Sequence, residues 1–261
     1  MTPERDQKPV SAKLARLRRL NLAATLFFGI QVVLLLILSD PVSLPVLGSF
    51  LTAAPGSDQF GTKDLFDLRV DLLVALFLAL ALIDHLFVAT LGRRNYESNV
   101  VRGINPVRWI EYSISASIMV VLIAMLSGAS DVVALLMMFG ANAAMILFGL
   151  VMERTNLGRE EVDWSPFVYG CLIGAVPWIG IAIQFMLSES DGSVPGFVYG
   201  IFVSLFMLFN GFAVNMWLGY RGKGRWNDPL FVELVYVILS LTAKTALAWQ
   251  VYSGALAGSS A

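Results

Sequence analysis

The stretch Ser240-Leu241-Thr242-Ala243-Lys244-Thr245-Ala246 places a lysine in the middle of the last apolar segment of the chain, 230–256. That segment is long enough to cross a bilayer, and a charged group at its centre is unfavourable by about 3 kcal/mol on insertion scales. A desolvated lysine loses its proton readily, and a neutral amine condenses with an aldehyde to a Schiff base. The position of Lys244 therefore indicates a functional amine; the alternative is a structural lysine paired with a buried acid.

The composition of the whole chain agrees with a membrane location for this segment. Of the 261 residues, 57% are hydrophobic and 14% are charged, and the mean hydropathy is +0.73. This balance is typical of an integral membrane protein. The net charge of −1 offers no basic face for nucleic acid, and the single Cys171 and single His85 exclude an internal disulfide and a multi-histidine metal site. We expect neither a metal site nor a nucleic-acid partner.

Seven segments have the length and apolar character of membrane-spanning helices. Four of them begin near a proline, which the first turn of a helix tolerates. The sequence therefore predicts an all-α integral membrane protein: a bundle of seven transmembrane helices in the cell membrane, with the lipid bilayer as a partner. The predicted spans are 20–39, 67–91, 106–127, 131–152, 165–187, 195–219 and 229–254.

The basic residues are unevenly divided between the two ends of these spans. Fifteen of the eighteen lie in the N-terminal segment and near the connections that follow the second, fourth and sixth spans. Only Lys63 and Arg69 lie on the other side, and Lys244 lies between. The positive-inside rule predicts that the N-terminus is cytoplasmic and the C-terminus extracellular.

The domain organisation follows from the spans and this orientation. We expect a basic cytoplasmic N-terminus over 1–19, a seven-helix membrane domain over 20–254 and a short external tail over 255–261. The first external loop, 40–66, is long and rich in proline, glycine, serine and aspartate. Residues 46–51 have the character of a short strand, and a loop of this length suits a cap or a dimer contact.

Polar residues inside the spans include a carboxylate near the start of the third. A buried Glu111 needs a cation, so it pairs either with Lys244 at depth or with Arg108 at the membrane surface. Counted from the same side, Glu111 lies about 8 Å and Lys244 about 22 Å along their helices. The lysine side chain leans back toward the start of its helix by several ångströms. A difference in depth between its amine and Glu111 remains. Ser115 shares a helical face with Glu111, and Ser240 shares one with Lys244.

Three further polar residues in the spans each have two interpretations. Asn142 and Asn210 either contact a ligand or simply join helices by hydrogen bonds. His85, near the basic end of the second span, is either a proton acceptor or a satisfied interfacial histidine. Most aromatic and methionine side chains of the later spans are packing residues, and a subset around Lys244 suits a long apolar polyene.

Seven spans with an amine in the seventh and an acid in the third resemble the microbial rhodopsins, and the details resemble the heliorhodopsins. The third span reads Arg108-Trp109-Ile110-Glu111-Tyr112-Ser113-Ile114-Ser115-Ala116-Ser117, with a glutamate as sole counterion. The seventh reads Ser240-Leu241-Thr242-Ala243-Lys244, where other rhodopsins usually carry aspartate four residues before the lysine. The predicted cytoplasmic N-terminus is inverted relative to those rhodopsins. The resemblance covers all seven spans and the long first external loop.

The resemblance implies a light-absorbing protein in which Lys244 holds all-trans retinal covalently as a protonated Schiff base. Glu111 is then the counterion, and Ser240 is a neighbour of the Schiff base. His85 belongs to a polar cluster toward the cytoplasm, although this chain lacks the further first-helix histidine of some family members. The implied pocket walls are Tyr112, Ser115, Met119, Asn142, Met145, Gly149, Trp178, Phe206, Phe209 and Asn210.

Heliorhodopsins are regarded as photosensory proteins with slow photocycles, mostly without ion pumping, and dimers are typical. The resemblance therefore implies a homodimer with a photosensory or regulatory role, an unknown downstream signalling partner and no enzymatic activity. Two alternatives stay open. One is a light-driven ion pump or channel of the microbial rhodopsin type. The other is a non-photoactive membrane transporter, or a membrane-embedded enzyme, in which Lys244 and Glu111 bind a substrate.

Overall fold

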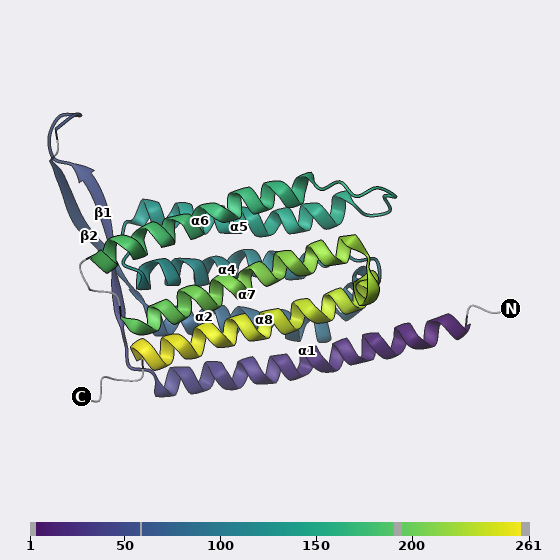
Figure 1. Cartoon of the computed structure of the whole chain (residues 1–261). Coiled ribbons are helices and arrows are strands. Elements are labelled where there is room, and N and C mark those ends of the chain that lie inside the picture. The colour runs from purple at the N-terminus through teal and green to yellow at the C-terminus, as the bar shows by residue number, and fades with distance from the viewer. Residues whose placement is uncertain (1–3, 58, 191–194, 257–261) are drawn as a thin grey trace.

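A computed structural model of the chain describes residues 4–57, 59–190 and 195–256. Within these residues, seven helices are long and apolar enough to cross a membrane, and they lie side by side in one bundle (Figure 1). The seven-helix prediction is confirmed, and the chain is a multi-pass membrane protein. The seven helices are α1 (Glu4–Leu38), α2 (Val70–Ala89), α4 (Pro106–Leu126), α5 (Val132–Thr155), α6 (Ser165–Ser190), α7 (Gly196–Arg221) and α8 (Pro229–Val251).

The two ends of the bundle differ (Figure 1). One end, called the basic end here, carries the start of α1, the short helix α3 (Arg93–Val101) and the 3₁₀ turn η1 (Gly224–Asn227). The other, the hairpin end, carries strands β1 (Ser43–Leu51) and β2 (Phe60–Arg69). The final π-helical turn η2 (Tyr252–Leu256) also lies there.

A β-hairpin accompanies the predicted helical bundle in the long first connection. β1 includes the predicted strand 46–51 but begins earlier, and it pairs antiparallel with β2, which the sequence analysis did not anticipate. The pairing runs from Ser43 opposite Arg69 to Leu51 opposite Phe60, with an irregularity after Val46. Extended backbone needs partners for its N–H and C=O groups, and a returning second strand supplies them.

The hairpin is fixed to the start of α5. The backbone N–H of Leu47 donates to the carbonyl of Ser130 (2.8 Å), and that of Ser49 donates to Asp131 Oδ2 (3.2 Å). Asp131 also caps α5, because its Oδ1 accepts from the N–H groups of Val133 (3.0 Å) and Ala134 (3.1 Å). One carboxylate therefore joins the hairpin to a membrane helix.

The basic N-terminal segment is continuous with the first span rather than a separate region. α1 has 35 residues, which corresponds to about 50 Å of helix and exceeds the thickness of a bilayer core. Near its start, Leu17 is buried against Val88 of α2, Tyr96 of α3 and Leu230 of α8. The part of α1 around Leu17, which precedes the predicted span, thus packs into the bundle at the basic end. Of the expected tail, residues 257–261 lie outside the described part.

Buried side chains divide the bundle into an apolar half and a polar half. Toward the hairpin end the core is built from residues such as Leu35, Val74, Leu122, Leu247 and Val251. Most buried ionisable groups of the described chain lie nearer the basic end. They are Asp84, His85, Arg108, Glu111, Glu153, Glu233 and Lys244. The chemistry of the protein is therefore concentrated in one half of the bundle.

Candidate functional site

Lys244 and Glu111 form a buried ion pair between α8 and α4. The lysine Nζ donates to Glu111 Oε1 at 2.7 Å, and Lys244 is only 3% exposed. The Nζ atom also lies 5.1 Å from the centroid of the Tyr112 ring, within the range of a cation–π contact. Removing either charge would leave the other buried without a partner, which is strongly unfavourable.

The register of α8 against α4 explains how Lys244 reaches Glu111, although the two residues lie at different distances from the starts of their helices. The Nδ2 of Asn105, at the start of α4, donates to Glu233 Oε1 (2.9 Å), and Tyr112 Oη donates to the carbonyl of Tyr236 (3.2 Å). α8 therefore begins about one helical turn further toward the basic end than α4. The side chain of Lys244 leans back along its helix over the remaining distance.

Arg108 has other partners than Glu111, so the alternative pairing at the membrane surface is wrong. Its guanidinium donates to Glu153 of α5 and to Glu233 of α8, and all three side chains are buried. The group lies over the ring of Tyr236, 3.9 Å from its centroid. Because two carboxylates hold Arg108, the cation that remains for Glu111 is Lys244.

Hydrogen bonds connect this arginine cluster to His85. Tyr96 Oη donates to Glu233 Oε1 (3.2 Å) and accepts from Asn21 Nδ2 (3.3 Å), while Asn21 Oδ1 lies 2.6 Å from His85 Nδ1. Since the amide oxygen can only accept, Nδ1 of His85 carries a proton. Burial raises the pKa of Tyr96 well above its ordinary value, so the phenol stays a donor. His85 also stacks on Phe28, with ring centroids 5.6 Å apart.

Asp84, to which the sequence analysis gave no role, lies next to His85 on α2. It is 9% exposed, and its Oδ1 has no hydrogen-bond partner among the described residues. Asp84 lies within electrostatic range of Glu111 and Lys244. A second buried carboxyl group is therefore present near the amine site. A single carboxylate five residues before the end of α2 is not recognisable from hydropathy, which registers mainly the apolar residues around it.

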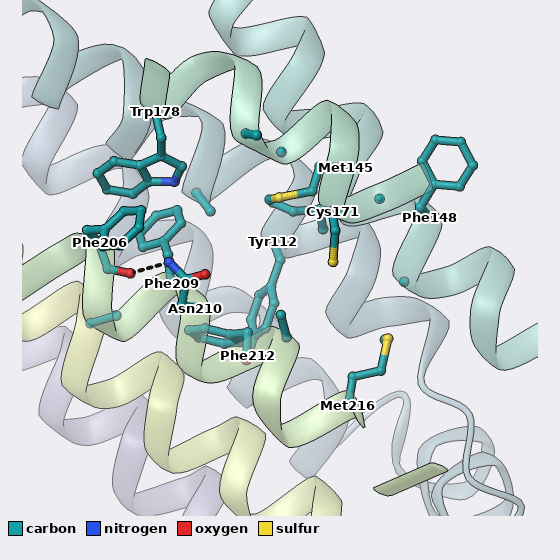
Figure 2. Close-up of a pocket in the computed structure, with 18 of the residues that line it drawn as sticks. Tyr112, Met145, Phe148, Cys171, Trp178, Phe206, Phe209, Asn210, Phe212 and Met216 are labelled. Carbon is teal, nitrogen blue, oxygen red and sulfur yellow. Dashed lines mark hydrogen bonds between the residues drawn. The ribbon is translucent and has the colours of Figure 1, made fainter. Parts of the chain in front are cut away.

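A cavity of about 630 Å³ opens beside Lys244 between α4, α5, α6, α7 and α8. Its walls are mostly apolar and aromatic, and Figure 2 shows Trp178 lying against Phe206 and Phe209 in one part of the wall. The ring centroid of Trp178 lies 5.2 Å from that of Phe206 and 5.6 Å from that of Phe209. A volume of this size is typical of sites for small organic ligands.

Most of the pocket walls proposed from the resemblance line this cavity. They are Tyr112, Met119, Met145, Gly149, Trp178, Phe206, Phe209 and Asn210, together with Ser240 and Lys244. Ser115 and Asn142 lie outside it. Ser115 is on the face of α4 that carries Glu111, whereas the cavity meets the neighbouring face that carries Tyr112. Asn142 Nδ2 donates to Ser117 Oγ (3.0 Å) and so joins α5 to α4.

The structure adds wall residues that the sequence analysis did not select. Trp109 and Ala116 continue the face of Tyr112 and Met119, so their helical spacing was an available signal. Gly149 has a packing role, because a Cβ there would come within 2.5 Å of the Trp109 ring. Other added wall residues are Ile146, Phe148, Pro166, Phe167, Gly170, Cys171, Gly174, Ala175, Ile179, Ala182, Phe202, Phe212, Ala213, Met216 and Ala243.

Seven membrane-spanning helices around an apolar cavity, with a buried lysine on the last helix and a carboxylate beside it, define a rhodopsin-type membrane protein. The family model of the heliorhodopsins matches residues 17–256. The chain therefore belongs to the heliorhodopsin family.

One similar solved structure is the crystal structure of the transmembrane domain of Salpingoeca rosetta rhodopsin phosphodiesterase. It has a TM-score of 0.69 and 15% sequence identity, and the match covers 97% of this chain and 88% of that one. At this identity the likeness shows the fold alone. A search of curated proteins finds no match.

Membership of the rhodopsin family implies a retinal chromophore in general, and the site fits one. Retinal is a long apolar polyene that ends in an aldehyde. The cavity has a mostly apolar wall, and the Lys244 amine lies on that wall where an aldehyde can reach it. The carboxylate needed to balance a charged nitrogen already lies 2.7 Å away.

Proposed function

We propose that this protein is a retinal photoreceptor in which Lys244 binds all-trans retinal as a protonated Schiff base and Glu111 is the counterion. The observation that supports this most is the buried amine on the wall of the apolar cavity, 2.7 Å from a carboxylate. When bound, retinal supplies light absorption and photoisomerisation. A carboxylate near the nitrogen favours its protonated form, so the chain itself stabilises the coloured state.

The cavity residues hold and orient the polyene. The rings of Trp178, Phe206 and Phe209 supply apolar contact on two helices, and Ser240 lies one turn before the amine on α8. The amide of Asn210 donates to the carbonyl of Phe206 at 2.8 Å (Figure 2). Its amide nitrogen is therefore engaged within α7, and we assign Asn210 to the wall of the cavity.

We propose that the output is photosensory or regulatory. A movement of charge at Lys244 acts on Glu111 and, through it, on the polar groups that join α1, α2, α3, α4, α5 and α8 near the basic end. The downstream partner is expected at this end, which we place in the cytoplasm because fifteen basic residues lie there and two at the other. Protease cleavage of an N-terminal tag in sealed cells would reverse this orientation.

The family resemblance also motivates a homodimer, and light scattering of the purified protein measures this directly. A monomer at all protein concentrations would refute that part of the proposal. The non-photoactive alternative, a transporter whose Lys244–Glu111 pair binds substrate, differs in a simple property: it stays colourless when retinal is added.

The covalent role of Lys244 is tested by its replacement with alanine. We expect that wild type expressed with retinal has a visible band which hydroxylamine bleaches, and that Lys244→Ala has none. Lys63→Ala removes an exposed lysine on β2 and should keep the band. A band of normal intensity in Lys244→Ala would refute the attachment site. A folded but colourless wild type would instead favour the transporter.

A further inference from the structure

We infer that Asp84 is a second acid of the Lys244 site, and that it carries a proton while Glu111 is ionised. This inference deepens the proposed function and, where colour is the readout, rests on it. Three properties of the buried groups support it: their charge balance, their hydrogen-bond partners and their positions along the helices.

Carboxyl groups outnumber cations in the polar half of the bundle. A buried charge without a partner is costly, and a carboxyl group in that situation takes up a proton instead. The bundle therefore retains fewer charges than its residue types suggest. The buried groups concerned are the cations Arg108 and Lys244 and the acids Asp84, Glu111, Glu153 and Glu233.

Hydrogen bonds single out Asp84 among the four acids. Glu153 and Glu233 both bind Arg108 and also accept hydrogen bonds from Asn105 (2.8 Å from its backbone N–H and 2.9 Å from its Nδ2). Glu111 accepts from Lys244. Each of these three carboxylates is therefore stabilised by a positive charge in direct contact.

Asp84 has no such contact. Neither an ion pair nor a hydrogen bond to its Oδ1 is present among the described residues, although the side chain is nine-tenths buried. The ionised form of this carboxyl group lacks compensation, and the protonated form does not need it. Asp84 is therefore the acid that holds the proton.

The position of Asp84 relates that proton to the amine. Asp84 lies five residues before the end of α2 and Glu111 five residues after the start of α4, so both are about 8 Å along their helices from the basic end. The charged groups within electrostatic range of Asp84 are Glu111 and Arg108 from α4 and Lys244 and Glu233 from α8.

The other neighbours of α2 contribute little charge at this depth. From α1, the uncharged Asn21 binds the adjacent His85, and the Nε of Arg18 donates to the carbonyl of Ala89 at the very end of α2 (3.3 Å). From α3, the neutral phenol of Tyr96 binds Glu233 rather than Asp84. The dominant partner for any charge on Asp84 is therefore the Glu111–Lys244 pair.

This arrangement predicts a colour change with pH. As pH rises, Asp84 releases its proton to solution and becomes a second negative charge beside the Schiff base. That charge stabilises positive charge at the nitrogen, widens the excitation gap and moves the band to the blue, while the Schiff base stays protonated. The step should be absent in Asp84→Asn, which has nearly the same shape and cannot ionise.

The first experiment is a pH titration of the visible spectrum of wild type, Asp84→Asn and Asp71→Asn. Asp71 is a matched control, because it is a buried aspartate on the same helix but is bonded to Arg69 at the hairpin end (2.7 Å). We expect one blue-shift step in wild type and Asp71→Asn and its loss in Asp84→Asn. A wild type without the step, or an Asp84→Asn variant that keeps it, overturns the inference.

The second experiment needs neither bound retinal nor visible illumination. Infrared spectra of the retinal-free protein should contain a carbonyl band from a protonated carboxylic acid that disappears in Asp84→Asn and persists in Glu111→Gln. Loss of the band in Glu111→Gln but not in Asp84→Asn would assign the proton to Glu111 and contradict the inference. Absence of any pigment with this infrared pattern intact would refute the proposed function alone.

Discussion

At the scale of single residues, the chemistry of this protein depends on which carboxylate meets which cation. Arg108 is held by Glu153 and Glu233, and this leaves the Lys244 amine to Glu111. The sequence left the pairing open, because Arg108 is three residues from Glu111 on the same helix, whereas the need for a cation at depth indicated Lys244. Only the three-dimensional arrangement separates a surface arginine pair from a buried amine pair.

The residue-scale prediction concerns Glu111. Removing its charge with Glu111→Gln should shift the protonated band to the red, or make the Schiff base lose its proton at lower pH, because both effects follow from loss of the negative charge beside the nitrogen. Absorption spectra recorded across pH measure both. Glu111→Asp restores a carboxylate and should move the properties back toward wild type. An unchanged band together with an unchanged titration in Glu111→Gln would exclude Glu111 as the counterion.

At the scale of helices and strands, the local sequence pattern determines which elements form, whereas tertiary contacts determine how the elements are positioned against one another. Apolar runs of spanning length predicted all seven membrane helices, because hydropathy acts on each segment separately. The offset of α8 against α4 depends on contacts such as that of Asn105 with Glu233, and no local pattern encodes it. For the same reason the sequence indicated β1 but not its partner β2, whose pairing is a contact between segments.

The sequence likewise predicted part of the candidate site. The cost of a charge in the membrane identified Lys244, and the need of a buried acid for a cation identified Glu111 as its candidate partner. Asp84 was not identified, because its importance depends on the absence of a partner in space. Ser115 and Asn142 lie outside the cavity. The sequence could not show this, because the position of a residue along a helix fixes the face on which it lies but not the segment that packs against that face.

The element-scale prediction concerns the attachment of the hairpin to α5. Hydrogen bonds from the N–H of Ala134 and from Ser49 lower the pKa of Asp131. A lowered pKa in the folded state means that the stabilisation is present above the ordinary aspartate pKa and is lost as pH falls through the folded value. Asp131→Ala should lower stability by about 1 kcal/mol near neutral pH, the usual effect of losing an N-cap.

Thermal unfolding of the purified protein at several pH values measures this effect. Asp131→Asn separates the two roles, since asparagine caps a helix nearly as well as aspartate but its amide nitrogen cannot accept from the Ser49 N–H, and it has no charge to titrate. Its stability should lie between those of Asp131→Ala and wild type near neutral pH and change less on acidification than that of wild type. Equal unfolding temperatures for Asp131→Ala and wild type would show that the cap does not stabilise the fold.

At the scale of the whole molecule, the two halves of the bundle offer a proton very different surroundings. From Lys244 toward the basic end lie the buried acids Glu111 and Asp84, and beyond them Glu233, Tyr96, Asn21 and His85 are joined by hydrogen bonds. Toward the hairpin end the core around Leu122 and Leu247 is apolar. Among the described residues, the buried acid at the hairpin end is Asp71, which is already bonded to Arg69, so a proton that leaves the amine meets its nearest ionisable acceptors on the basic side.

This asymmetry predicts that the protein does not pump protons. A pump needs an acceptor on one side of the amine and a donor on the other, and in pumping rhodopsins the donor is commonly a carboxylate eleven residues after the counterion, about 16 Å further along the same face. Eleven residues after Glu111 is Leu122, which is fully buried among apolar side chains, and 118–126 contains no ionisable residue. A released proton therefore returns by the route on which it left. Light-induced pH recordings on unbuffered cells, repeated with a protonophore, should show no sustained change; a sustained, protonophore-sensitive change would establish the ion-pump alternative.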